Sequence, residues 1–201
     1  MSSFFHEFQD HLVPMLRSGD LDACERTVVE QIRSLPRSPF DLSIEVNISN
    51  NPADAARHFD RFFEIEAQKI TIAAAYTEMN GFYINPKLWF CDVFAYTAYG
   101  GHADYDWLSD WQSGEFPRYP IRGMEVLQAV YASSAYGQES FRDAENMSSL
   151  LVVIKFQQFI RRAATQMEQL RFPLLVTAHD FDFIAEVALR RGLRPPSGQL
   201  A

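Results

Sequence analysis

The stretch KITIAAAYTEMNGFYI, residues 69–84, indicates the fold class of this chain. Its first ten residues are rich in β-branched and apolar side chains and predict a strand. Asn80-Gly81 follows, and because both residues tolerate positive φ, the pair predicts a tight hairpin. Phe82 to Ile84 and then Leu88 to Thr97 would continue the chain as an antiparallel meander.

Two further segments are predicted strands. From Leu42 to Ile48, apolar residues alternate with polar ones. This period of two indicates a strand with one buried and one solvated face. Leu174 to Thr177 is a short apolar run and predicts one more buried strand.

Helical periodicity covers much of the remaining chain. The N-caps predicted are Asp20 for the second helix and Asn50 or Asn51 for the third, because such side chains accept backbone N–H groups. The predicted helices are residues 3–17, about 20–35, a third that follows Asn51 and includes Ile65, about 123–134, about 141–170, and a last one from Asp180 or Asp182 through Arg190.

This order of elements predicts the α+β class, with an antiparallel sheet built around the Asn80-Gly81 hairpin and packed against several helices. The chain has 201 residues, which suits one domain with a substantial core, predicted over residues 1–193. Pro195-Pro196 and Ser197-Gly198 stop regular structure, so residues 194–201 are predicted to form a flexible tail.

The charge balance narrows the classes of partner. The formal net charge is -8 and the isoelectric point is about 5.1. Such a chain lacks the Lys and Arg that neutralise nucleic-acid phosphates or anionic membranes, so neither is a predicted partner. An acidic protein attracts a basic one, since opposite fields raise the rate of association. Solubility alone would also explain an acidic composition.

Cysteine use and the N-terminus indicate a reducing compartment. Cys24 lies in a predicted helix and Cys91 in an apolar predicted strand, so both are expected to be buried free thiols. The segment MSSFFHEFQDHLVPML has acidic residues and no basic region, so no signal peptide is predicted. No apolar run approaches the length of a membrane span. We expect a cytoplasmic protein.

Motifs for catalysis are missing from the sequence. Ser133 and Ser134 have no Gly-x-Ser-x-Gly surroundings, and apolar neighbours would blunt the reactivity of Cys91. No glycine-rich nucleotide motif occurs, so no cofactor is predicted. One metal-site alternative combines His102, Asp104 and Asp106, which share a face if extended, with His179 from a distant segment. These four residues would support a small metal-dependent hydrolase.

Residues 102–119, within the stretch HADYDWLSDWQSGEFPRYPI (102–121), are the predicted partner-binding region. Trp and Tyr offer large contact area at low entropic cost, and interleaved carboxylates would complement a basic partner. The same rings could instead belong to the core, with the acids solvating a loop. The predicted contact residues are Asp104, Tyr105, Asp106, Trp107, Asp110, Trp111 and Glu115.

In overall character the chain resembles the immunity proteins that bacteria pair with secreted toxins. The stretch FYINPKLWFCDVFAYTAYGGHADYDWLSDW, residues 82–111, carries this resemblance. It implies a non-enzymatic protein that neutralises a cognate, basic toxin by occluding its active site. The alternatives are the metal-dependent hydrolase and a structural or adaptor homodimer that associates through the Phe-rich N-terminal helix.

Overall fold

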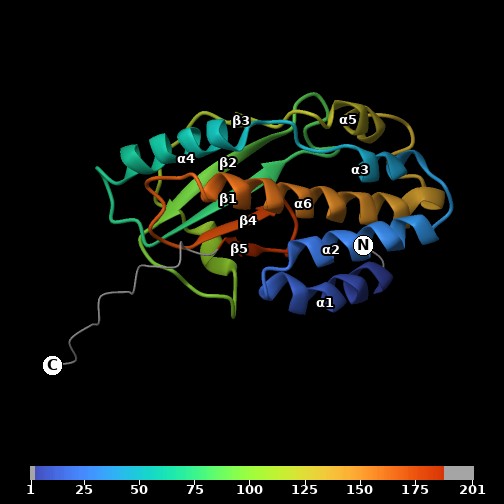
Figure 1. The fold of residues 1–201 in the computed structure, drawn as a ribbon, viewed down its shortest axis with the longest axis horizontal. Coiled ribbons are helices and arrows are strands. Elements are labelled where there is room, and N and C mark those ends of the chain that lie inside the picture. Colours follow the sequence, from blue (N-terminus) through green and yellow to red (C-terminus); the bar gives the residue numbers. More distant parts are fainter. Residues whose placement is uncertain (1–2, 188–201) are drawn as a thin grey trace.

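A five-stranded sheet forms the framework of the molecule, with strand order β3-β2-β1-β4-β5. The computed structural model describes residues 3–187, and Figure 1 views it from the side on which α6 lies in front of the sheet. The fold is α+β, as predicted. Its strands are β1 (Ala74–Asn80), β2 (Phe90–Tyr96), β3 (Tyr119–Pro120), β4 (Leu174–Ala178) and β5 (Ala185–Val187), and its α-helices are α1 (Ser3–Arg17), α2 (Leu21–Ser34), α3 (Leu42–Glu45), α4 (Pro52–Glu66), α5 (Glu125–Tyr131) and α6 (Arg142–Ala164).

The sheet is mostly antiparallel, with one parallel pair. β1 and β2 are antiparallel neighbours, as the meander prediction requires, with Ala74 opposite Tyr96 and Asn80 opposite Phe90. β4 then pairs with β1 in parallel, and β5 returns antiparallel to β4. The chain reaches β4 only after α5 and α6, because a parallel neighbour needs a long crossover connection.

Helix α6 is the centre of the core. It packs against the sheet and against α1, α2 and α4, so nearly its whole surface is covered. A helix in this position is buried on nearly all sides, and the central run from Leu150 to Ile154 is apolar and fully buried. In residues 3–187, no helix combines the length and apolar character that a bilayer crossing needs.

The N-terminal helices follow their sequence signals. Asp20 caps α2, because its carboxylate accepts the N–H of Ala23 at 2.9 Å. Asn51 caps α4 in the same manner through Ala53 at 3.0 Å, and Pro52 occupies the first turn. Cys24 and Cys91 are buried free thiols, as expected, and burial raises the pKa of the Cys91 thiol to about 12.

The predicted strand from Leu42 to Ile48 was wrong. Leu42–Glu45 is the single-turn helix α3, and the chain then runs extended without pairing to the sheet. The reason lies in α6: the buried Lys155 ammonium donates to the carbonyls of Ser43, Ile44 and Val46, at 2.8, 3.2 and 2.5 Å. Main-chain oxygens that a strand would use in a ladder instead solvate one buried cation.

The tight hairpin at Asn80-Gly81 was also wrong, although the strands that it joins are correctly paired. β1 ends at Asn80 and β2 begins at Phe90, so residues 81–89 connect them. Asn80 remains in the strand, where its amide donates to Asp92 Oδ2 at 3.1 Å. Gly81 serves packing, since a side chain there would press against the buried Trp89 indole.

The last predicted helix, from Asp180 or Asp182 through Arg190, was wrong over its described part. Residues 185–187 form β5. Thr177 Oγ1 donates to the carbonyl of Phe181, and Gln157 of α6 donates to that of Phe183 at 2.6 Å. These buried polar groups hold the chain in a turn that leads into the edge strand. Residues 188–193 and the predicted tail 194–201 lie outside the described residues.

Candidate functional site

The two faces of the sheet have different coverings. Side chains alternate along each strand, so the residues that face away from α6 form one set, here called the outer face. Tyr76 of β1 lies there beside Phe94 of β2 and Leu175 of β4. In the described chain, the hydrophobic cluster on this face holds no α-helical residue. Its buried members are Ala74, Tyr76, Tyr96, Leu175 and Ile184, and Phe94, Tyr105, Trp107 and Leu108 pack against them.

The loop after β2 covers one end of the outer face. Trp107 packs edge-on to Tyr96, with ring centroids 5.0 Å apart, and its indole N–H donates to the Gly101 carbonyl at 3.2 Å. Gly100 is required beside it, because a β-carbon there would collide with the indole. Tyr96 donates its hydroxyl to the Leu108 carbonyl at 2.8 Å. Trp107 is thus half-buried and its first role is to hold this loop on the sheet.

Trp111, unlike Trp107, is exposed to solvent. It rests on Phe94 with 5.1 Å between ring centroids, yet half of its surface, 50%, is exposed. Phe94 in turn stacks on Tyr76 at 5.9 Å. These three rings form a continuous aromatic ridge that ends in solvent, an arrangement typical of contact surfaces.

The acidic residues of the predicted segment divide into two groups. Asp104, Asp106 and Asp110 are exposed on the loop that carries Trp107 and Trp111. Asp104 also shapes this loop, because its Oδ1 accepts the Asp106 N–H at 2.7 Å. Glu115 is exposed elsewhere: its neighbour Gly114 donates to Glu66 at the end of α4, beside the edge of β2.

Two carboxylates of the outer face were missed from the sequence. Glu78 and Asp92 lie directly opposite each other on β1 and β2. Burial raises the pKa of the Asp92 carboxyl, the charge of Glu78 raises it further, and Arg118 opposes both. Strand alternation was the available signal, because it puts Tyr76 and Glu78 on one face. We call Tyr76, Glu78, Asp92, Phe94, Asp104, Asp106, Asp110 and Trp111 the acidic aromatic face.

The four candidate metal ligands do not assemble. His102 pairs with Glu186 of β5 at 3.0 Å and bonds Tyr105, while His179 pairs with Glu78 at 3.3 Å. The exposed carboxylates of Asp104 and Asp106 complete neither pair. Across residues 3–187, no group of three or more His, Cys, Asp or Glu side chains is placed to hold a metal ion.

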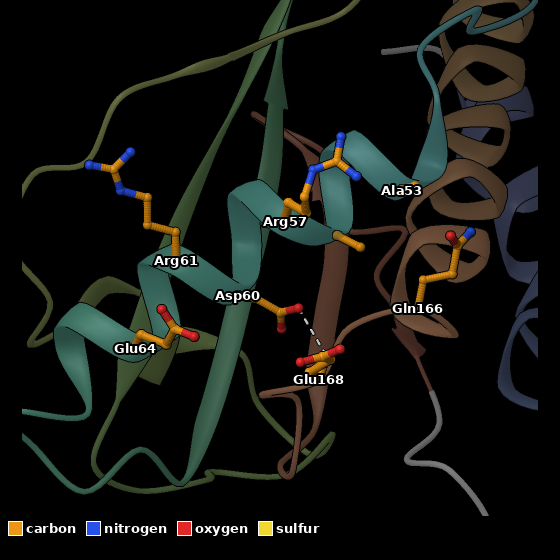
Figure 2. Close-up of a pocket in the computed structure, with 8 residues that line it drawn as sticks. Ala53, Arg57, Asp60, Arg61, Glu64, Gln166 and Glu168 are labelled. Carbon is orange, nitrogen blue, oxygen red and sulfur yellow. Dashed lines mark hydrogen bonds between the residues drawn. The ribbon is translucent and has the colours of Figure 1, made fainter.

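A surface depression with a volume of about 710 Å³ lies on the helical side. Figure 2 shows it between α4 and the loop after α6, with Arg61 extending away from Asp60 and Glu168. The Asp60 carboxylate accepts the backbone N–H groups of Glu168 and Gln169 at 2.9 and 2.8 Å. Its central acid therefore stabilises a turn, and the depression presents no convergent set of free polar groups.

No protein-family model, curated protein or solved structure matches this chain in comparisons of sequence and fold. The acidic aromatic face is therefore interpreted from its own geometry. It combines a ridge of rings with carboxylates from β1, β2 and the loop after β2, and within residues 3–187 its hydrophobic cluster holds no α-helical residue.

Proposed function

We propose that this chain is a non-enzymatic binding protein that docks a basic protein partner on its acidic aromatic face. More specifically, we propose a cytoplasmic bacterial immunity protein that neutralises a cognate toxin by covering its active site. The observation that carries the proposal is the outer face of the sheet, where a partly exposed aromatic ridge meets carboxylates from strands and loop.

The composition of the face supports a protein partner. Interface centres are enriched in Trp, Tyr and Phe, surrounded by a polar rim. Trp111 and Phe94 would form such a centre, with Asp106 and Asp110 at the rim. Rim charges act mainly by steering, so the association rate with a basic partner should fall as salt rises.

The geometry of the described residues supports the two alternatives less well than the binding proposal. The metal-dependent hydrolase needs His102 and His179 in one site, and each instead pairs with a different glutamate. The homodimer was to use the Phe-rich N-terminal helix, but Phe5, Leu12 and Leu16 of α1 are buried within the chain. That apolar stripe is therefore already occupied.

The experiment is affinity capture from the native host at low and moderate salt, read by mass spectrometry, and repeated with Asp106→Lys/Asp110→Lys. Neither side chain makes a hydrogen bond that holds the loop, whereas Asp104 does. The double change reverses two charges. At about 8 Å in water each unit pair contributes roughly 0.5 kcal/mol, so affinity should fall about ten- to thirtyfold at low salt.

A matched control carries the same charge change elsewhere. Glu7 of α1 and Glu30 of α2 are exposed, so Glu7→Lys/Glu30→Lys alters net charge equally without touching the outer face. A stoichiometric basic partner, lost by the first variant and kept by the second, is the expected result. If both variants lost the partner equally, or if capture of the partner depended neither on salt nor on either pair of substitutions, the acidic aromatic face would not be the interface.

A further inference from the structure

A second, smaller cavity lies where the carboxyl ends of the parallel strands β1 and β4 meet the start of α6. Its volume is about 250 Å³, and it contains none of the residues of the acidic aromatic face. The loops that follow the two strands supply Phe82, Tyr83 and Phe181, and the first turns of α6 supply Glu145 and Asn146. In open α/β sheets, ligands commonly bind at the carboxyl ends of parallel strands.

Five aromatic rings form a continuous wall of this cavity. Tyr83 stacks on Tyr136 with centroids 4.8 Å apart, and Tyr136 lies 6.2 Å from Tyr131. Tyr131 then meets Phe82 at 5.3 Å, and Phe82 meets Phe181 at 5.7 Å. Ring faces carry negative electrostatic potential, so such a wall attracts an organic cation.

The charged groups around the cavity also favour a cationic ligand. Burial raises the pKa of the Glu145 carboxyl, and its charge helps to raise the pKa of both Tyr131 and Tyr136, which places that charge beside the rings. Asp180 adds a second carboxylate at the rim. No Lys or Arg of residues 3–187 lines the cavity, and its lining histidine, His179, already faces the carboxylates of Glu78 and Asp180.

Two further observations mark this cavity as a site. The amide Nδ2 of Asn146 is buried with no hydrogen-bond partner in the described structure, although buried donors are nearly always satisfied. Phe82 and Asp180 are also the only residues other than glycine with positive φ in residues 3–187, at 55° and 63°. Both line this cavity, and strained backbone gathers at ligand sites.

We propose that the cavity binds an organic cation, a guanidinium or alkylammonium group on a short carbon chain. The cation lies against the tyrosine wall and pairs with Glu145, and where the ligand also carries an acceptor oxygen, that oxygen accepts from Asn146 Nδ2. The ligand is either a free small molecule or an arginine side chain of a protein, since both present the same chemistry.

Isothermal titration calorimetry on the full chain tests this, with three probes: methylguanidinium, N-acetylarginine methylamide and the uncharged N-acetylcitrulline methylamide. We expect saturable binding of at least one guanidinium probe, and at least tenfold weaker binding of the citrulline compound. Trp89 provides a second readout, because its ring lies 5.4 Å from Phe82 and should change fluorescence on binding.

The variant Glu145→Gln removes the charge but keeps an oxygen that accepts the Gly137 N–H, now bonded at 2.9 Å. Guanidinium binding should weaken at least tenfold, while the exposed control Glu139→Gln at the same end of α6 should bind as before. Tight binding of methylguanidinium alone would identify a free small molecule, and preference for the arginine derivative a protein side chain. Equal binding of the citrulline compound, unaltered binding by Glu145→Gln in a folded variant, or no saturable binding of either cation would overturn the proposal.

Discussion

Lys155 should be among the most stabilising polar side chains of this fold, and Lys155→Met is the substitution that tests it. Its ammonium is buried in the middle of α6 and donates to three main-chain oxygens in and after α3. Met has a similar length and no donor. The change therefore leaves the carbonyls of Ser43, Ile44 and Val46 without their partner while nearly preserving packing volume.

The magnitude follows from the three bonds. Hydrogen bonds to charged groups contribute about 1.5–3 kcal/mol each, so losing three costs roughly 4.5–9 kcal/mol before compensation. Burying the ammonium has its own desolvation cost of several kcal/mol, which the variant no longer bears. We expect a net loss of about 3 kcal/mol, which corresponds to a fall in Tm of roughly 10 °C for a domain of this size.

Urea unfolding followed by circular dichroism measures the free energy of unfolding, and hydrogen exchange reports the segment 42–48 separately. The matched control is Lys87→Met, because Lys87 is exposed and its replacement should change stability by less than about 0.5 kcal/mol. If Lys155→Met cost no more than this control, Lys155 would not be what holds residues 42–48 away from the sheet.

For two other substitutions, the pKa shifts predict the direction in which stability should change with pH. Burial lowers the pKa of His58 from its usual 6.5. The contribution of His58 to stability should therefore be complete above pH 6.5 and be lost as the pH falls through the folded pKa. In urea unfolding measured between pH of about 7.5 and 5, His58→Gln should make the free energy of unfolding less dependent on pH. Asp92→Asn should raise stability near neutral pH, because burial raises the pKa of Asp92 and the folded state therefore disfavours its charge. That gain should vanish in acid, where Asp92 is protonated, and a gain that persists there would contradict the electrostatic explanation.

The elements that the sequence predicts well are those whose signals are local. Asp20, Asn51 and Pro52 act within one turn of their own helices, and the structure confirms those helix starts. The pairing of β1 with β2 joins neighbours in the chain, so the meander prediction found it. Local propensity and tertiary structure agree at these places.

Two of the errors arise where a side chain from another element decides the conformation. Alternation over residues 42–48 is a sound strand signal, but Lys155, more than a hundred residues later, removes the carbonyls from any ladder. The helical pattern before Arg190 likewise gave way to bonds from Thr177 and Gln157. One buried hydrogen-bond donor can override the alternating pattern of a predicted strand. Because Lys155 lies far from residues 42–48 in the sequence, a local sequence window cannot reveal its effect.

The candidate site was predicted only in part, because some of its residues come together through contacts between different strands. Trp111, Asp106 and Asp110 were identified from composition, and all three are exposed, with Trp111 packed on Phe94 of the outer face. Glu78 and Asp92 were missed because their proximity depends on strand register. Whether these residues bind a partner stays a prediction until the capture experiment is done.

The pairing of Glu78 with Asp92 is itself an argument for a binding role. Like charges directly opposite on neighbouring strands destabilise a sheet, and Asp92 is partly desolvated as well. Partners within the chain offset part of this cost, because Asn80 donates to Asp92 at 3.1 Å, Tyr76 donates to Glu78 at 3.0 Å, and Arg118 lies 3.7 Å from Asp92. A basic partner group between the two carboxylates would relieve the repulsion, so the cost to the free protein becomes part of the affinity of the complex.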